Sequence, residues 1–426
     1  MIGPTNERQA MTTALAENVP VARMTGELAA RVLPQAARPV SLVRTCDFTV
    51  SVTQRIEEVE PVWRGLTASS GVESPGQSYD FIRLWVAYRN VALEDQRFVV
   101  AHLHGQPIAL LPLHRRRVGG IRVFTWFPGS QVGCYAPVSN AAVLATLGPQ
   151  GREALWQAMA GALRGADALY LRSVTTRIDG RNTLFDELGS SLAAETLYRS
   201  QFASWDECAR EQRSRSRRKH DRQQGDRLTA LGDVRFEQVT EPEAGAEAID
   251  VMFRQRSARF QAQGIRDVFV CDKLVGFYRQ AMEEGSGVDV RLHVLRLDGE
   301  IVAVRYNIVD VERMFCLISS MSEDPDIQIG SPGKQCLLRV MQSVFEDGIT
   351  MFDMGQGFTD EKRHWCNVEV PLRHHYIGLT WRGHAAIGLH RAFHHIRRKA
   401  KSHLRFKNSL RHLRQWSGLL ITGGLF

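Results

Sequence analysis

Two stretches in different halves of the chain align residue for residue around a turn, and this repeat constrains the fold more than any other feature. They read VVAHLHGQPIALLPL and LHVLRLDGEIVAVRY. Gly105-Gln106-Pro107 and Asp298-Gly299 are typical of turns that join two strands in a hairpin. In each half a third strand, a helix (152–164 and 333–347) and a further strand follow. This order occurs twice and predicts two similar α/β units in tandem, rather than two unrelated hairpins.

The length of the chain agrees with more than one unit, because a single core seldom serves 426 residues. Residues 1–40 are rich in Ala, Thr, Arg and Pro without periodicity, which indicates a loose tail. Residues 210–222 hold seven basic and two acidic residues, which predicts a connecting helix with either a solvated or a phosphate-binding basic face. We predict five segments: a flexible N-terminal tail (1–44), a first unit (45–205), a basic helical connector (206–232), a second unit (233–380) and a basic amphipathic C-terminal extension (381–426).

The composition is ordinary for a soluble globular protein, with 44% hydrophobic and 23% charged residues. No apolar run approaches the roughly 18 to 20 residues of a membrane span. The first residues lack the pattern of a secretory signal, and a transit peptide is the weaker alternative. The seven cysteines are odd in number and include no C-x-x-C pair, which argues against a disulfide framework or a zinc ribbon. The sequence therefore predicts a cytoplasmic protein.

The net charge of +8 is concentrated at the C-terminal end. Residues 370–426 contain eleven Lys or Arg and no Asp or Glu. The rest of the chain contains the other 43 Lys and Arg together with all 46 acidic residues. Large apolar residues are interleaved with this charge between 389 and 410, which predicts an amphipathic basic helix or helix pair. Its apolar side could pack on the core, or it could dock peripherally on anionic lipids at the inner membrane surface.

The residues that can carry chemistry gather in IGSPGKQCLLRVMQSVFEDGITMFDMGQGFTDEKRHW, residues 329–365. Ser331 suits the cap of a helix, Pro332 its first position, and Gly348 the position after its end. Gly333 would let a ligand approach the backbone. The free N–H groups of the first turn, together with Lys334, favour a phosphate or pyrophosphate. The same residues also make a plain, well-capped helix.

This order of strand pair, glycine-bearing turn, helix and strand resembles the acyl-CoA-binding half of the Gcn5-related N-acetyltransferase (GNAT) fold. SPGKQCLL, FDMGQG, Lys362 and Trp365 are similar to the cellulose-biosynthesis-associated branch (CelD-like, acetyltransferase 6), with its P-G-x-x-L, F-D-x-G-x-G and K-x-x-W motifs. QSYDFIRLW (77–85) and the basic connector resemble further elements of that branch. The resemblance spans roughly residues 45–378.

The resemblance implies an α/β (α+β) fold of tandem GNAT-like units, each a mixed, mostly antiparallel sheet flanked by helices. It implies direct acyl transfer from acetyl-CoA or another acyl-CoA, without a metal. The expected acceptor is a sugar or amine, as a small molecule or glycan, in polysaccharide or cell-envelope biosynthesis. The donor would be held by the turn residues Gly330, Ser331, Gly333, Lys334 and Gln335.

The sequence does not match the usual GNAT loop motif, [R/Q]-x-x-G-x-[G/A], because Pro332 replaces its last small residue. The resemblance also leads us to expect a carboxylate soon after the second glycine of the F-D-x-G-x-G motif. In this chain the proton-accepting role therefore shifts to Asp353 or Glu361, or is lost. Lys362 is expected to bind an anionic group of donor or acceptor. The alternative for Asp353 is a strand-end carboxylate that caps a turn.

The acceptor side is expected to draw on both units, since a tandem fold places its site between halves. Gln77, Tyr79 and Asp80 would line it from the first unit, and Trp365 would stack on a sugar or the pantetheine arm. The alternatives are a helix start for Tyr79 and core packing for Trp365. Neither the histidine pair at 102/104 nor the adjacent pair at 374/375 has a third ligand at a convincing spacing, so no metal site is expected.

Two other functions remain open. Fem-type peptidyltransferases resemble this tandem layout and use aminoacyl-tRNA, and the basic connector would suit RNA, although nucleic acid is not the expected partner. The third possibility is a non-catalytic scaffold of a polysaccharide-assembly system, with the basic C-terminal extension as its anchor.

Overall fold

The computed structural model describes residues 48–68, 72–128, 132–178, 180–182, 184, 191–264, 266–271 and 273–402. All of these residues belong to one compact unit, Cys46–Phe426. The predicted N-terminal tail, 1–44, and the part of the C-terminal extension after residue 402 therefore lie outside the described residues.

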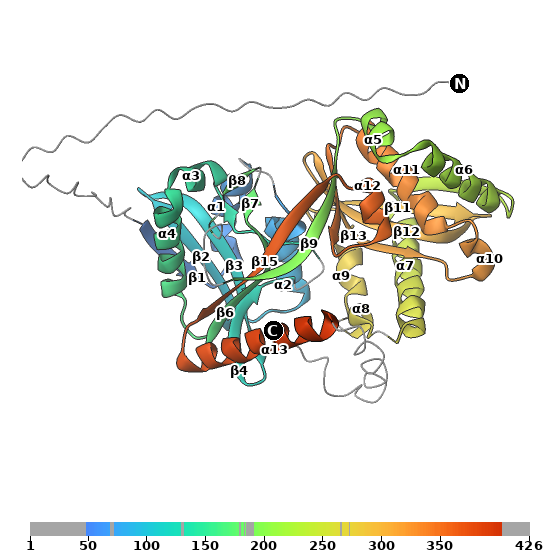
Figure 1. The fold of residues 1–426 in the computed structure, drawn as a ribbon. Coiled ribbons are helices and arrows are strands. Elements are labelled where there is room, and N and C mark those ends of the chain that lie inside the picture. The colour runs from blue at the N-terminus through green and yellow to red at the C-terminus, as the bar shows by residue number, and fades with distance from the viewer. Residues whose placement is uncertain are drawn as a thin grey trace, which may run out of the picture. The chain divides into compact units, whose positions relative to one another are not determined.

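Most strands of the described chain join one 13-stranded sheet, shown in Figure 1. Its order is β1-β2-β3-β4-β6-β15-β9-β14-β13-β12-β11-β10, with β5 on β3; β7 and β8 pair separately. The strands are β1 (Phe48–Thr53), β2 (Gln96–Leu103), β3 (Gln106–Val118), β4 (Ile121–Trp126), β5 (Val138–Ser139), β6 (Ala168–Thr175), β7 (Arg177–Ile178), β8 (Arg181–Asn182), β9 (Ser191–Gln201), β10 (Val234–Val239), β11 (Asp289–Leu297), β12 (Glu300–Asp310), β13 (Arg313–Met321), β14 (Met351–Gln356) and β15 (Val368–Gly378).

The helices complete the mixed α/β architecture. They are α1 (Glu60–Ala68), α2 (Tyr79–Tyr88), α3 (Ala141–Thr146), α4 (Gly148–Ala162), α5 (Trp205–Gln212), α6 (Arg215–Thr229), α7 (Pro242–Ala262), α8 (Val268–Cys271), α9 (Val275–Gln280), α10 (Pro325–Gln328), α11 (Pro332–Glu346), α12 (Asp360–Trp365) and α13 (Trp381–Ser402), with short 3₁₀ turns at Ile56–Val59, Pro75–Gln77 and Leu93–Asp95. None of the described helices has the length and apolarity needed to cross a membrane.

The internal repeat is visible in the sheet. In each half an edge strand pairs with a hairpin, a third antiparallel strand follows, and a helical crossover leads to a parallel partner: β1 to β6 in the first half, β10 to β14 in the second. Both hairpin turns place two residues at positive φ, His104-Gly105 (51° and 78°) and Asp298-Gly299 (49° and 86°), as type I′ turns require. The predicted first turn at Gly105-Gln106-Pro107 is corrected to His104-Gly105, because β3 already begins at Gln106.

The two halves exchange their last strands at the centre of the sheet. β9 belongs to the first half of the sequence but pairs with β14 of the second, and β15 of the second half pairs with β6 of the first. β9 and β15 also pair with each other, antiparallel, over most of their length. The fold class predicted from the sequence is confirmed, and the exchange adds a link between the repeats that periodicity does not reveal.

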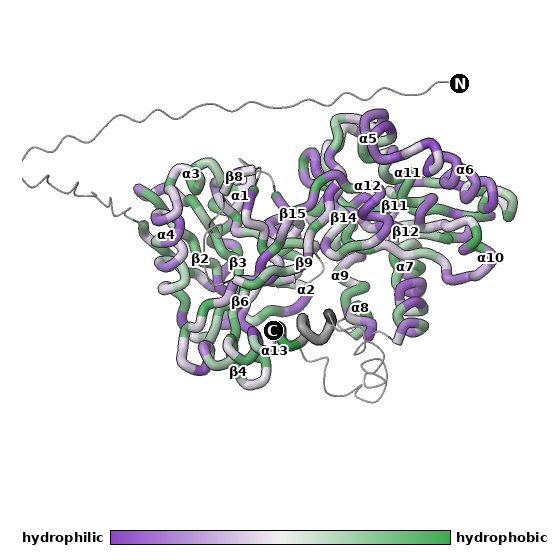
Figure 2. Tube along the Cα trace, in the orientation of Figure 1, coloured by the Kyte–Doolittle hydropathy of each residue, from purple (hydrophilic) through white to green (hydrophobic). Residues whose placement is uncertain are grey.

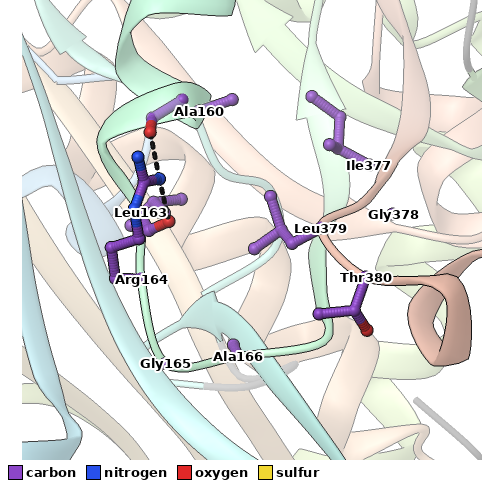
Figure 3. A pocket seen from close by; sticks show the side chains of 10 residues that line it. Ala160, Leu163, Arg164, Gly165, Ala166, Ile377, Gly378, Leu379 and Thr380 are labelled. Carbon is purple, nitrogen blue, oxygen red and sulfur yellow. Dashed lines mark hydrogen bonds between the residues drawn. The ribbon is translucent and has the colours of Figure 1, made fainter.

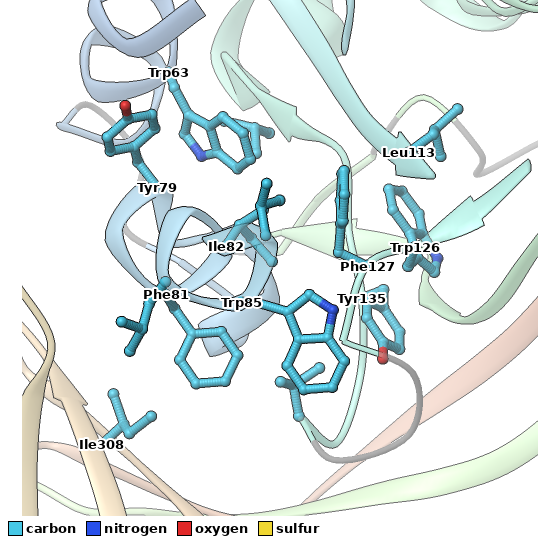
Figure 4. Packing of buried hydrophobic residues seen from close by; sticks show 14 of the residues in the cluster. Trp63, Tyr79, Phe81, Ile82, Trp85, Leu113, Trp126, Phe127, Tyr135 and Ile308 are labelled. Carbon is cyan, nitrogen blue, oxygen red and sulfur yellow. The ribbon is translucent and has the colours of Figure 1, made fainter. Parts of the chain in front are cut away.

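The hydrophobic core is continuous across the two repeats. Figure 4 shows part of it, around α2, where Trp63, Phe81 and Trp85 are buried together with Ile308 of β12. Phe277 of α9 receives the rings of Phe81 and Trp85 edge-on, with centroids 5.2 and 5.1 Å away. The α2 helix therefore packs the first repeat against the second.

Opposite faces of the second half are covered by different helices. Side chains alternate along β12, and Arg305 donates to the carbonyl of Gly333 on α11, whereas Tyr306 donates to the carbonyl of Tyr278 on α9. The predicted connector is two helices rather than one, because Ser214 interrupts it and caps α6 by accepting from the N–H of Arg217. The α6 helix lies against α11 and covers its start.

Candidate active site

The strands β13 and β14 separate within the second half. They pair in parallel over three positions, ending at Phe315 and Asp353, although β13 continues to Met321. On the other side of β13, Tyr306 faces Ile318 and Asn307 faces Cys316, so Leu317 is an extra residue in a β-bulge. One edge of residues 316–321 therefore has no partner on β14. Such an edge presents backbone groups that a substrate can use in place of a neighbouring strand.

The α11 helix begins beside this edge. Its N-cap, Ser331, has a φ of 51°, and its hydroxyl accepts from Gln224 of α6 at 2.8 Å instead of capping the helix. The N–H groups of Lys334 and Gln335 donate to the carbonyl of Ser331. Gly333 is buried, and a Cβ there would lie 2.7 Å from the sulfur of Met321. The glycine thus fits the close approach of α11 to β13.

Two of the predicted donor-binding residues are used for packing against α6. Gln335 is 3% exposed, and its amide donates to the carbonyl of Asp221 at 2.8 Å. A Cβ at Gly330 would meet Leu228 of α6 at 2.8 Å. The structure therefore places Gln335 and Gly330 in the α6–α11 contact, and Lys334, which is partly exposed, remains the basic side chain at the helix start.

Positive charge from three helices meets at this helix start. The pKa of His364 on α12 is lowered by partial burial and by the charges of Arg217, Arg363 and Lys334, which come from α6, α12 and α11. Burial disfavours any charge, so it is the three cationic side chains that would favour an anion here, and Arg217 among them already pairs with Asp221 at 2.9 Å. Arg217 and His364 were not among the predicted site residues. The basic composition of 210–222 was the available signal, but it does not identify which residue turns inward.

A buried arginine, Arg305, connects the separated strands to both neighbouring helices. It is 5% exposed and donates to the Gly333 carbonyl at 3.2 Å and to the Cys316 sulfur at 3.8 Å. It also pairs with Glu361 of α12 at 3.6 Å, and the Glu361 side chain is 34% exposed. Sequence reasoning missed Arg305, although a single arginine within the apolar strand IVAVRYNIV was a signal. Of the two predicted proton acceptors, Glu361 is the one that reaches solvent.

The other acceptor, Asp353, belongs to a buried charge cluster between the repeats. Arg199 of β9 pairs with Asp353 at 2.9 Å and with Glu73 at 2.6 Å, and Arg313 pairs with Glu73 at 3.0 Å. Asp353 also accepts from the N–H of Gly355 at 2.7 Å. Burial raises the pKa of the Asp353 carboxyl, and Arg199 and that N–H oppose the rise. Through these contacts Asp353 holds the chain where it leaves β14.

The glycine-rich exit of β14 is held from its other side by Lys362. The ammonium donates to the carbonyls of Gly355, Gln356 and Gly357 at 3.1, 2.7 and 2.8 Å, and the residue is 9% exposed. Both glycines have positive φ, 78° and 85°, which explains the G-x-G spacing. The ammonium has three N–H donors, and all three are engaged within the chain. Burial lowers the pKa of Lys362.

The remaining predicted residues do not line the separated strands. Trp365 is 2% exposed and stacks on Trp205 with a centroid distance of 6.2 Å, so it belongs to the core. Tyr79 packs edge-on against Trp63, and burial raises its pKa to about 12. Asp80 pairs with Arg64 at 3.0 Å.

Gln77 has an indirect link to the charge cluster. Its amide oxygen accepts from the N–H of Glu73 at 2.6 Å, and its amide nitrogen donates to the carbonyl of Pro137 at 2.8 Å. It therefore positions Glu73 for the ion pair with Arg199.

A hollow on the first half lies away from these residues. Figure 3 shows it between the end of α4 and the end of β15, lined mostly by small and apolar side chains with Arg164 at its edge. Arg164 donates to the carbonyls of Leu163, at 3.0 Å, and Gly161. The guanidinium thus bonds to its own loop. Among the described residues, no group of three His, Cys, Asp or Glu side chains could hold a metal ion.

A known family model matches the part of the chain that holds these residues. Residues 215–363 match the family model described as an acetyltransferase (GNAT) domain, about a third of the chain, from α6 to α12. No curated protein matches the chain at a significant level.

Solved structures that match include three proteins of low identity. The C-terminal domain of a putative lysylphosphatidylglycerol synthetase from Agrobacterium fabrum is 14% identical, with 75% of this chain and 91% of that one covered and a TM-score of 0.46. A conserved protein of unknown function from Bacteroides thetaiotaomicron is 12% identical, with 77% and 100% covered and a TM-score of 0.49. A tandem GNAT protein from the clavulanic acid biosynthesis pathway is 12% identical, with 78% and 98% covered and a TM-score of 0.39.

The segment that matches the family model contains the separated strands, the start of α11 and the exit of β14. Residues 215–363 are a GNAT-superfamily acetyltransferase domain, and the chain that carries them is a transferase.

Proposed function

We propose that the protein is an acyl-CoA-dependent acyltransferase of the cellulose-biosynthesis-associated branch. The observation that carries the proposal is the separated β13–β14 pair next to a positively charged helix start, within the segment that matches the GNAT family model. The donor's phosphates would lie at the start of α11, near Lys334, Arg217 and His364. The thioester would lie along the unpaired edge of residues 316–321, whose backbone N–H groups can polarise its carbonyl.

The transfer step needs a proton acceptor beside this edge. In the proposed step, the lone pair of an acceptor amine or hydroxyl forms a bond to the thioester carbon. The C–S bond breaks, CoA leaves as the thiolate, and the acceptor's proton passes to Glu361 directly or through water. Arg305, 3.6 Å from Glu361, holds that carboxylate toward the separated strands. The acceptor we propose is a sugar or amine of a polysaccharide or envelope precursor. The F-D-x-G-x-G motif at 352–357 and the K-x-x-W motif at 362–365 support the branch.

Isothermal titration calorimetry with acetyl-CoA and with CoA tests the donor site. Lys334→Glu places a negative charge at the helix start, so we expect CoA affinity to fall at least about tenfold. Lys219→Glu makes the same charge change on an exposed part of α6, two positions from Arg217 and thus turned away from it. We expect this control to stay within about threefold of wild type. Equal losses of CoA affinity in both variants would indicate a general electrostatic effect rather than a binding site. If wild type does not bind CoA, acyl-CoA is rejected as the donor.

A second donor is favoured by one observation on α6. This helix exposes five basic side chains: Arg215, Arg218, Lys219, Arg222 and Arg227. Such a row suits a polyanion, so an aminoacyl-tRNA donor is the alternative function. The same pair of variants separates the two. If tRNA is the donor, Lys219→Glu weakens tRNA binding and reduces its salt dependence, and neither variant affects CoA. If neither CoA nor tRNA binds, the non-catalytic scaffold is the remaining reading.

A further inference from the structure

The α13 helix is held on the first half by its inner face. A Cβ at Gly383 would lie 1.7 Å from the carbonyl oxygen of Asp167, so only glycine allows this approach. Ile387 and His390 are buried on the same side, with the His390 ring 5.5 Å from that of Tyr376. Just before the helix, the N–H of Leu379 donates to the same Asp167 carbonyl at 2.8 Å. These contacts fix which side of α13 faces outward.

The outward side carries large apolar side chains. Trp381 is 79% exposed, Leu389 69% and Ile396 65%, and Phe393 is 52% exposed. At about 100° per residue these four positions fall within roughly a third of the helix circumference. Figure 2 colours several residues of this helix as hydrophobic. Single exposed apolar residues are ordinary on protein surfaces, but an aligned row along one helix marks an interaction surface.

The charge of the sequence segment that carries this row is uniformly positive. Residues 370–426 contain eleven Lys or Arg and no acidic residue, and Arg382 and Arg391 are exposed on α13 itself. A second copy of the face, or the chain's own residues 403–426 with Arg405, Lys407 and Arg411, would bring like charges together while burying them. Nucleic acid would match the charge but offers little aliphatic surface. An anionic lipid surface matches both properties.

We propose that the outward face of α13, defined by Trp381, Leu389 and Ile396, docks the protein on an anionic membrane surface. The helix lies in the interface with these side chains among the lipid headgroups and upper acyl chains, and the basic residues contact lipid phosphates. This inference does not depend on the identity of the acyl donor.

Co-sedimentation of the full chain with lipid vesicles tests the proposal. Vesicles of equal parts phosphatidylcholine and phosphatidylglycerol should bind the wild type at least about tenfold more tightly than pure phosphatidylcholine, and high salt should weaken the binding. Leu389→Glu and Ile396→Glu each place a carboxylate on the face and should each weaken binding at least about tenfold. Val311→Glu is the matched control, because Val311 is 82% exposed in the turn between β12 and β13; its binding should equal that of wild type.

Three results would overturn the proposal. Equal loss of binding with Val311→Glu would show that added negative charge anywhere suffices. Unchanged binding in the two α13 variants, with a lowered melting temperature, would show that the face is covered within the chain. Dissociation of a dimer by Leu389→Glu in sedimentation velocity would show that the occupant is a second copy.

Discussion

At the scale of single residues, Arg199 links the two repeats through buried ion pairs. Its guanidinium is 7% exposed and bonds to Glu73, from the first repeat, and to Asp353, from the second. Removing one member of a buried charge network leaves its partners uncompensated, which commonly costs about 3 to 5 kcal/mol. We expect Arg199→Met to lower the free energy of unfolding by about 3 kcal/mol or more, measured by urea titration.

Arg199→Lys and a double variant sharpen this expectation. Lysine keeps the charge but not the planar fork that serves two carboxylates, so its loss should be intermediate. Adding Asp353→Asn to Arg199→Met removes one of the two buried carboxylates that have lost their partner, and it should recover part of the stability. An unchanged free energy of unfolding in Arg199→Met would show that Glu73 and Asp353 have sufficient partners without Arg199.

At the scale of elements, the exit of β14 is shaped by α12 through Lys362. Lys362→Met would leave the carbonyls of residues 355–357 without their donor, at a cost of about 2 kcal/mol. We expect a lower melting temperature with CoA affinity within about threefold of wild type. Arg363→Met is the control for the melting temperature on the same helix, because Arg363 is 59% exposed and pairs only with Asp360 among the described ion pairs. A tenfold weaker CoA affinity at unchanged melting temperature would instead support the predicted anion-binding role.

Elements were easier to predict than contacts for a physical reason. Helix α11 follows from its local signals, Pro332 at the start and Gly348 after the end, and the repeat follows from hairpin turns, which are also local. The charge cluster joins Arg199 to residues 126 and 154 positions away, and no local pattern encodes such a pair. The site residues from the first unit illustrate the same limit. Gln77 and Tyr79 were read as cleft residues, but burial and backbone bonding engage them within the fold.

At the scale of the whole molecule, the strand exchange and shared core make the two repeats one folding unit, so a buried group in either repeat affects global stability. His293 of β11 is 1% exposed, and burial together with the charges of Arg291 and Arg305 lowers its pKa to about 4. The unfolded chain binds this proton near pH 6.5. Between these values the unfolded state holds more protons than the folded state, so stability falls as the pH is lowered.

The size of this effect can be measured against a variant that does not titrate. From the gap between the two pKa values, His293 alone should make the protein roughly 2 kcal/mol less stable at pH 5 than at pH 8. His293→Gln keeps a polar side chain next to Asn307, which lies 3.0 Å from the His293 ring nitrogen, but removes the titration. Urea unfolding of both proteins at the two pH values should show a pH-dependent loss that is smaller in the variant by that amount. Equal losses in both proteins would mean that the pKa of His293 is the same in the folded and unfolded states.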